Sequence, residues 1–266
     1  MLPRWSVLAL CLPGCLVSFE DYPLGDLDGA AQGEAGAGGS ETPAAVGGSA
    51  AGEAPSLEGG AAAEGGAPAT SAEVSALDDF EHEDSTILEL DGRKGDWYVS
   101  NDGRGVQTPP AGADLLPTPL ERARGGSTHA LHTSGGPFFS WGALVGASFS
   151  SGERYDLSGY RGIRMWVRSS PSAMMGPGAA KQVRLNLTTT ATSAGGPCTV
   201  CNDHFGADIP LSSQWVLVDL PLKSLKQVGF GRPQLEQDLS AVVDLQLTFP
   251  ANVAFDLWVD DVELYR

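Results

Sequence analysis

The stretch Phe255 to Tyr265, FDLWVDDVELY, contains the pattern that decides the fold. Its apolar residues form two sets of opposite parity, first Phe255, Leu257 and Val259 and then Val262 and Leu264. Apolar residues at every second position lie on one face of a strand. One extra residue at Asp260-Asp261 returns both sets to the same face, as a β-bulge does. The pattern predicts a long core strand whose bulge displays two carboxylates.

The same alternation recurs along the chain. Ile163, Met165 and Val167 alternate with Arg164, Trp166 and Arg168. Further short β-like runs cover residues 97–99, 130–132, 143–149, 183–189, 215–220 and 243–249. Strands with one apolar and one polar face pack as two antiparallel sheets. Because no convincing amphipathic helix is present, residues 76–266 are predicted to form an all-β domain, an antiparallel jelly-roll β-sandwich.

The segment before this domain differs in composition. From Glu20 to Asp84 there are 15 acidic residues and no Lys or Arg, among many Gly, Ala, Ser and Pro residues. Such a segment buries too little apolar surface to offset its ordering entropy, so we expect a disordered linker over residues 15–75, with a reach of roughly 40 Å. The formal net charge of −17 belongs mainly to this linker. The nearly neutral domain gives nucleic-acid binding no electrostatic support.

The N-terminus has the features of a secretion signal. Arg4 supplies a positive charge, and residues 5–10 form an apolar run too short to span a bilayer. Leu12-Pro13-Gly14-Cys15 resembles the lipobox of bacterial lipoproteins, which implies cleavage after residue 14 and lipidation of Cys15. Leu16 follows the cysteine, so in a Gram-negative cell we expect an anchor in the outer membrane. The alternative is an ordinary signal peptide cut elsewhere.

Four motifs in order resemble the galactose-binding-like jelly rolls. They are Asp78 to Glu81 (DDFE), Tyr160 to Arg168 (YRGIRMWVR), Trp215 to Leu220 (WVLVDL) and Phe255 to Leu264 (FDLWVDDVEL). Within that group the chain is similar to carbohydrate-binding modules of family eleven and to complex I intermediate-associated domains. The resemblance covers roughly residues 76 to 266. The resemblance implies the same fold, and it says less about which ligand is bound.

The resemblance also implies a structural calcium between the first and last acidic motifs. Carried over by position, the ligands would be Asp79 or Glu81 and Asp260 or Asp261. Hard cations such as calcium prefer oxygen ligands, and backbone carbonyls would complete a shell of about six to eight oxygens. The alternative is that these acids are solvated ends of strands.

Several polar and aromatic residues alternate with the core residues and are predicted to point out of the sandwich. A tryptophan face can stack on a pyranose, and planar side chains can bond to its hydroxyls. The predicted carbohydrate-binding residues are Arg164, Trp166, Arg184, Asn186, Gln246, Asp256 and Trp258. The alternative for each tryptophan is packing beneath loops, since large aromatics are highly buried on average.

Cys198 and Cys201 form a CxxC sequence followed closely by His204. In an exported chain we expect a disulfide that shapes a short loop. A zinc site formed by these three residues is the alternative, and it would need reduced thiols and a fourth ligand.

No sequence motif for a nucleophile, a metalloprotease or a phosphate loop is present. We therefore predict a non-catalytic, monomeric, membrane-tethered domain that binds a polysaccharide or other glycan and holds calcium. One alternative is an envelope structural or assembly lipoprotein that binds a protein partner through the same sheet face. Another is a polysaccharide hydrolase, because two catalytic carboxylates can come from any part of a chain.

Overall fold

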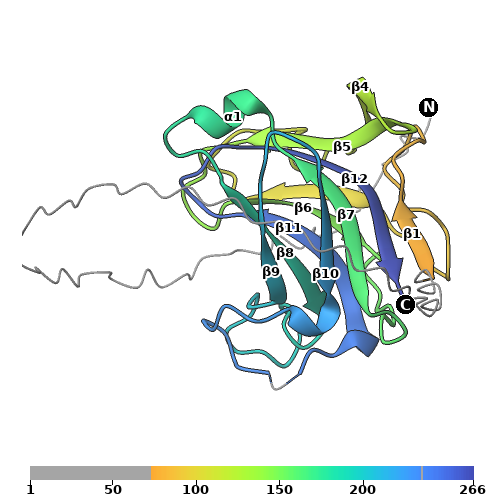
Figure 1. Cartoon of the computed structure of the whole chain (residues 1–266). Coiled ribbons are helices and arrows are strands. Elements are labelled where there is room, and N and C mark those ends of the chain that lie inside the picture. The colour runs from red at the N-terminus through yellow and green to blue at the C-terminus, as the bar shows by residue number, and fades with distance from the viewer. Residues whose placement is uncertain (1–72, 235) are drawn as a thin grey trace, which may run out of the picture. The chain divides into compact units, whose positions relative to one another are not determined.

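The computed structural model describes residues 73–234 and 236–266 (Figure 1). The predicted signal peptide at residues 1–14, the lipidation of Cys15 and nearly all of the linker at residues 15–75 lie outside the described residues. Within the part that is described, no helix has the length and apolar character needed to cross a membrane.

The described chain is almost entirely β-structure. Its strands are β1 (Val74–Asp78), β2 (Trp97–Asn101), β3 (Gln107–Thr108), β4 (Thr118–Arg124), β5 (Ser127–Gly135), β6 (Ala143–Ser148), β7 (Gly162–Arg168), β8 (Gln182–Thr189), β9 (Phe205–Pro210), β10 (Val216–Pro221), β11 (Val242–Phe249) and β12 (Phe255–Tyr265). The helical elements are the short helix α1 (Pro171–Met175) and two single turns, η1 (Leu222–Ser224) and η2 (Leu239–Ala241).

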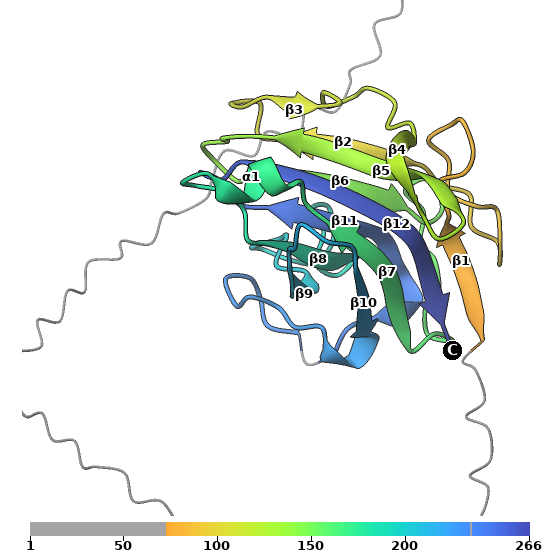
Figure 2. The ribbon, with the colours of Figure 1, turned by 45° about the horizontal axis from the view of Figure 1, so that its top comes forward.

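The strands form two sheets. The β12 sheet has the order β10-β7-β12-β5-β3, with β1 also paired to β12 and β4 to β5. The β11 sheet has the order β2-β6-β11-β8-β9. All pairings within both sheets are antiparallel, and Figure 2 shows β5, β12 and β7 running side by side. The predicted all-β antiparallel sandwich is confirmed.

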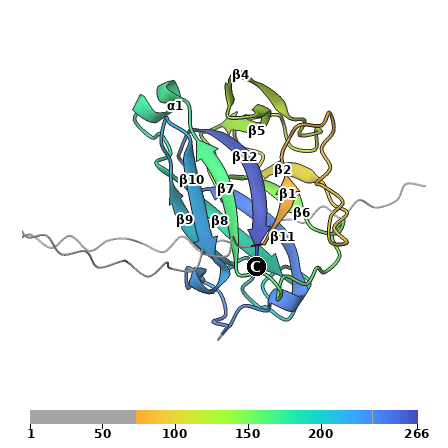
Figure 3. The ribbon, with the colours of Figure 1, turned by 45° about the vertical axis from the view of Figure 1, so that its right-hand side comes forward.

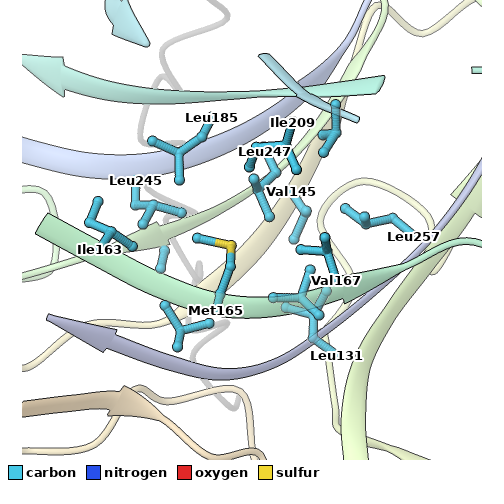
Figure 4. Close-up of a cluster of buried hydrophobic side chains, with 14 of the residues drawn as sticks. Leu131, Val145, Ile163, Met165, Val167, Leu185, Ile209, Leu245, Leu247 and Leu257 are labelled. Carbon is cyan, nitrogen blue, oxygen red and sulfur yellow. The ribbon is translucent and has the colours of Figure 1, made fainter. Parts of the chain in front are cut away.

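The core lies between the sheets and consists of the predicted apolar positions. Ile163, Met165 and Val167 of β7 are fully buried, and they meet Leu245 and Leu247 of β11 in one cluster (Figure 4). Burying a side chain of this size stabilises the fold by about 1.5–3 kcal/mol. The polar residues that alternate with these positions therefore point away from the core on both sheets.

The predicted bulge is present in β12. The pairing of β12 with β7 shifts register between Asp260 and Glu263, and Asp261 has a positive φ of 43°. The extra residue leaves the apolar residues on both sides of it fully or almost fully buried: Phe255, Leu257, Val259, Val262 and Leu264. After the bulge, β1 pairs with β12, with Asp78 opposite Val262 (Figure 3). The first and last strands of the domain are thus neighbours.

Strand β9 is one element that the sequence pattern did not predict. Its sequence FGADIP contains Gly206 and ends at Pro210, both of which usually indicate a loop. Both residues are tolerated here because β9 lies at the edge of the β11 sheet, with β8 as its sheet neighbour.

Candidate functional site

The structure divides the seven predicted carbohydrate-binding residues between two opposite faces. Strands β7 and β12 place four of them on the outer face of the β12 sheet: Arg164, Trp166, Asp256 and Trp258. Strands β8 and β11 place the other three on the outer face of the β11 sheet: Arg184, Asn186 and Gln246. All seven point outward, as predicted, but they form two surfaces rather than one.

A row of residues crosses the outer face of the β11 sheet at one level. Opposite one another on neighbouring strands lie Tyr98, Gly146, Gln246, Asn186 and Gly206. We call this set the β11 row. Its members come from all five strands, so the row runs across the full width of the sheet.

Tyr98 was not among the predicted site residues, and its position depends on Gly146. A Cβ atom on Gly146 would lie 2.6 Å from Cζ of Tyr98, so the tyrosine ring occupies the space that a side chain there would fill. Gln246 Nε2 donates a hydrogen bond to the Tyr98 hydroxyl at 3.1 Å. Burial, with the nearby Asp244 carboxylate, raises the pKa of Tyr98, so it remains a neutral phenol. The signal for this residue was a strand run, Trp97 to Val99, with tyrosine in the outward position.

Arg184 and Asn186 hold each other in place at the other end of the row. Arg184 Nε donates to Asn186 Oδ1 at 3.1 Å, and Asn186 Nδ2 donates to Thr248 Oγ1 at 3.2 Å. The guanidinium also reaches Asp208 Oδ1 at 3.3 Å. Gly206 adds no side chain, and a Cβ there would lie 2.3 Å from Asn186 Oδ1. The row therefore presents fixed amide and guanidinium groups, with the Asn186 amide lying over Gly206.

A loop borders the β11 face beyond β9. Gly206 and Lys226 exchange two backbone hydrogen bonds, which join the loop to the β9 edge. The buried carboxylate of Asp203 accepts hydrogen bonds from the backbone N–H groups of Val228, Gly229 and Gly231 at 2.8–3.0 Å. The Asp203 carboxylate and the backbone bonds to β9 thus fix the loop beside the β11 face.

The predicted disulfide between Cys198 and Cys201 is present just before Asp203. The disulfide leaves no thiolate for the alternative zinc site. His204 is buried and lies within hydrogen-bond distance of Thr192, with Nδ1 2.8 Å from the threonine Oγ1. Burial lowers the pKa of His204 to about 4, so the imidazole is neutral at pH 7. The short ring therefore shapes the loop, as expected.

On the outer face of the β12 sheet, aromatic and basic side chains alternate in a continuous stack. The His132 and Trp258 rings stack with their centroids 4.0 Å apart. The Arg168 guanidinium lies 4.7 Å from the Trp258 ring and 5.0 Å from the Trp215 ring. Arg124 lies 5.6 Å from Trp215 and 4.8 Å from Trp166. We call this series the aromatic ladder, and its members in order are His132, Trp258, Arg168, Trp215, Arg124 and Trp166.

The ladder changes the role expected of the predicted tryptophans. His132 on β5 and Arg168 on β7 both lie opposite Trp258 of β12, one on each side. Both faces of the Trp258 ring are therefore covered, and neither is open for stacking on a sugar. Trp166 also has a guanidinium over its ring. Both rings therefore have packing partners in the folded domain.

The other two predicted residues of this face are engaged by neighbours. Arg164 pairs with Asp219 at 2.9 Å and lies over the Tyr265 ring. Asp256 lies 3.4 Å from His132 Nε2 and accepts from the backbone N–H of Ser170 at 3.3 Å. Burial alone would raise the pKa of Asp256, but these hydrogen bonds lower it, so the carboxyl is ionised at pH 7.

The four predicted calcium ligands are divided in the structure. Asp79 lies in a separate group with Asp78 and His82, whose ligand atoms are all within 4.8 Å of one another. The other three belong to a second group, in which Arg124 pairs with both Asp261 and Asp260. The guanidinium of Arg124 lies 2.9 Å from Asp260 Oδ2 and already supplies one positive charge.

Four oxygen atoms nevertheless meet at this place. Ser127 Oγ lies 3.2 Å from Glu81 Oε1, 2.7 Å from Asp260 Oδ2 and 2.9 Å from the His129 carbonyl oxygen. One hydroxyl has a single proton to donate, and three acceptors surround it. Glu81, Asp260, Ser127 and the His129 carbonyl thus bring oxygen atoms together at one place, and Asp79 does not belong to this set.

A separate groove of about 1100 Å³ lies at one end of the sandwich, lined among others by Tyr160, Leu222, Lys223, Leu239 and Tyr265. None of the predicted carbohydrate-binding or calcium-binding residues lines it.

Several solved structures are similar to this chain. The family 11 carbohydrate-binding module of a cellulosomal cellulase of Clostridium thermocellum is 16% identical, and the match covers 73% of this chain and 95% of that chain with a TM-score of 0.47. The family 11 module from the same organism in complex with a β-1,3-1,4-mixed-linked tetrasaccharide gives 16% identity, 73% and 96% coverage and a TM-score of 0.47. A family 30 module of another cellulosomal cellulase of that organism is 13% identical, and the match covers 72% of this chain and 96% of that chain with a TM-score of 0.46. No family model and no curated protein matches the chain.

Proposed function

We propose that this chain is a non-catalytic glycan-binding domain and that the outer face of the β11 sheet is its binding surface. The observation that carries the proposal is the β11 row, in which an aromatic ring, two amides and two glycines lie in line across five strands. At both glycines a neighbouring side chain takes the space that a side chain there would fill, Tyr98 at Gly146 and Asn186 at Gly206, so the ring and the amide lie close over the sheet. The Tyr98 ring offers a surface for stacking, and Gln246 and Asn186 offer donors and acceptors for hydroxyls.

The polar groups of this face are held before any ligand arrives. Arg184, Asn186 and Thr248 are joined by hydrogen bonds, and Gln246 is bonded to Tyr98. Side chains that are already ordered lose less entropy on binding, which favours affinity. The two carboxylates that the register places here are engaged as well, Asp208 by Arg184 and Asp244 by Thr188.

The test is isothermal titration of the domain with a panel of neutral oligosaccharides. Tyr98→Ala should weaken binding about tenfold or more, as expected for the loss of a stacking aromatic. Tyr98→Phe should retain most of the affinity because the ring remains. Leu217→Ala is the matched control, since Leu217 is an exposed residue that lies opposite Trp166 on the other face. Unchanged binding by Tyr98→Ala, or equal loss in the control, would contradict the proposal.

We propose further that the Glu81 and Asp260 carboxylates hold a calcium ion, together with Ser127 and the His129 carbonyl. The support is the meeting of four oxygens from β5, from β12 and from the chain after β1. Such an ion would add positive charge between two carboxylates and join the ends of the domain. It would have no role in chemistry at the β11 row.

Lipidation of Cys15 and anchoring in an outer membrane remain proposals as well. Their support is the short apolar run followed by a lipobox-like sequence. Radiolabelled palmitate should be incorporated into the full chain but not into a Cys15→Ala variant. Incorporation through Cys11 instead would contradict this assignment.

The second candidate function is binding to a protein partner. Strand β10 is an edge of the β12 sheet, and both Val216 and Leu217 are exposed on it. An edge strand with exposed apolar residues can pair with a strand of another chain. A partner captured by the wild-type domain and lost on Val216→Lys, without glycan binding, would favour this function over the first.

A further inference from the structure

Arg168 lies at the centre of the aromatic ladder, between two indole rings. Its guanidinium is 4.7 Å from the ring of Trp258 and 5.0 Å from that of Trp215. Arginine is weakly hydrated and stacks well on aromatic faces. The two rings therefore hold the guanidinium in a fixed plane on the outer face of the β12 sheet.

Two other arginines on this face, Arg124 and Arg164, have acidic partners. Arg168 has none in the described part of the chain. Arg124 pairs with Asp260 and Asp261, and Arg164 pairs with Asp219. No hydrogen-bond acceptor or carboxylate among residues 73–234 and 236–266 contacts the Arg168 guanidinium, and its Nε atom is buried without a partner. The two terminal nitrogen atoms, which make no hydrogen bond with the described residues, are suited to a planar oxyanion, which they can bind through two parallel hydrogen bonds.

The surroundings of Arg168 favour a ligand that carries hydroxyls as well as an anion. Asp256 lies two residues before Trp258 on the same strand face, and Ser134 lies opposite Asp256 on β5. Ser170 contacts the Asp256 carboxylate through its backbone N–H. The ionised Asp256 would repel a second carboxylate placed next to it, but it is a strong acceptor for sugar hydroxyls. A compact acid bordered by hydroxyls fits this pattern, whereas a run of acidic peptide side chains does not.

We infer that Arg168 is the anion-binding residue of a second site, on the outer face of the β12 sheet, which takes the carboxylate of a hexuronate residue in an acidic saccharide. The carboxylate is held by the guanidinium between Trp258 and Trp215, and sugar hydroxyls are held by Asp256 and Ser134. The site is separate from the β11 row, so it does not depend on the function proposed for that row.

The experiment compares hexuronate oligomers with neutral oligomers of the same linkage, by isothermal titration and by tryptophan fluorescence. Because Trp215 and Trp258 flank the bound carboxylate, hexuronate binding should change the tryptophan emission of the wild type, and the neutral oligomer should not change it at this site. This comparison needs no variant, so it remains decisive even if a substitution at Arg168 lowers stability.

The variants separate this site from the β11 row. Arg168→Gln should weaken hexuronate binding by about tenfold to a hundredfold, the usual range for a charge-assisted pair. Arg168→Lys should recover only part of the affinity because a lysine lacks the planar fork. Arg164→Gln is the matched control on the same strand and face, and Tyr98→Ala tests the other face. Both should bind hexuronate as the wild type does.

Several results would overturn the inference. One is equal affinity of the wild type for hexuronate and neutral oligomers at this face, and another is unchanged hexuronate binding by Arg168→Gln. Binding of sulfated oligosaccharides that lack uronic acid, without binding of hexuronate oligomers, would contradict the assignment of a carboxylate ligand. An acidic peptide that binds more tightly than the hexuronate oligomer would contradict the saccharide.

Discussion

Glu81 and Asp260, from opposite ends of the folded domain, share the hydroxyl of Ser127. Ser127 Oγ is 3.2 Å from Glu81 Oε1 and 2.7 Å from Asp260 Oδ2. The pairing of β1 with β12 brings the two acidic motifs together, as the sequence pattern predicted. The prediction that the two motifs lie side by side is confirmed. A calcium ion between them remains a proposal that can be tested directly.

Calcium should raise the thermal stability of the domain if the proposed ion site exists. After treatment with a chelator, added calcium should increase Tm by several degrees, because an ion that binds only the folded state stabilises it by mass action. Asp260→Asn should abolish the increase. Asp79→Asn should leave it unchanged, since Asp79 lies in the other group. An equal increase in Tm on addition of calcium to both variants would contradict the proposed set of ligands.

The stability of the domain in acid should depend on Glu81. Burial opposes ionisation, but hydrogen bonds from Thr128, His129 and Ser127 dominate and lower the pKa of Glu81 to about 2, from an ordinary 4.5. A lowered carboxyl pKa stabilises the folded state above pH 4.5, and this contribution is lost as the pH falls towards 2. Because the side chain is about one-third exposed, we expect the contribution to be only about 1 kcal/mol.

The check is urea unfolding of the wild type and of Glu81→Gln at a series of pH values. The free-energy difference between them should be largest near neutral pH and should vanish in strong acid. Asp78 and Asp260 act in the opposite sense, because burial raises their pKa values. The pH dependence of the wild-type stability alone would combine the contributions of all three carboxyl groups. A free-energy difference between wild type and Glu81→Gln that does not change with pH would contradict the role given to Glu81.

Arg93 should be among the most sensitive positions for stability. It is fully buried and donates to Ser75 Oγ at 2.9 Å and to the Ala76 carbonyl at 2.6 Å, both on β1. Arg93→Met should reduce the free energy of unfolding by about 3 kcal/mol, because these buried acceptors lose their donor. Arg154→Met, at an exposed position, is the control. Similar unfolding midpoints in denaturant for the two variants would be inconsistent with this role.

Gly146→Ala should impair the β11 row without removing any polar side chain. The new methyl would lie 2.6 Å from Tyr98 Cζ, so the ring must move away. Glycan affinity should fall by about the same factor as in Tyr98→Ala. Gly126→Ala, where a Cβ meets nothing within 4 Å, should keep the affinity of the wild type. Full binding by Gly146→Ala would show that the position of the ring does not matter.

Asp203→Ala should loosen the loop that borders β9. Three backbone N–H groups lose their common acceptor, at Val228, Gly229 and Gly231. We expect faster hydrogen exchange at these amides and a loss of about 2 kcal/mol in stability. Asp238→Ala is the control, because its carboxylate caps a different turn at Ser240. Protection of the three amides in Asp203→Ala would contradict the role.

The alternation of residues predicted which side chains leave the core but not which surface they form. Met165 and Leu247 mark the core positions of β7 and β11 equally well, and each strand has outward polar neighbours. Which sheet each strand joins depends on pairing between distant segments, and no local pattern encodes that pairing. The seven predicted residues therefore point away from the core, as expected, but they lie on the outer faces of two different sheets.

The same limitation explains the residues that the sequence did not suggest. Tyr98 belongs to the β11 row only through the pairing of β2 with β6, which places it opposite Gly146. Arg124 lies on β4, a largely exposed strand with no apolar alternation to identify it. The bulge at Asp260-Asp261 was predictable because a change of parity within one strand is a local signal.

The two outer faces are turned away from each other across one hydrophobic core. If each outer face binds a different saccharide, a single copy of the domain can bind two polymers at once without forming an oligomer. A dilute mixture of the domain with one neutral and one acidic polymer should then thicken or precipitate, and either polymer alone should not.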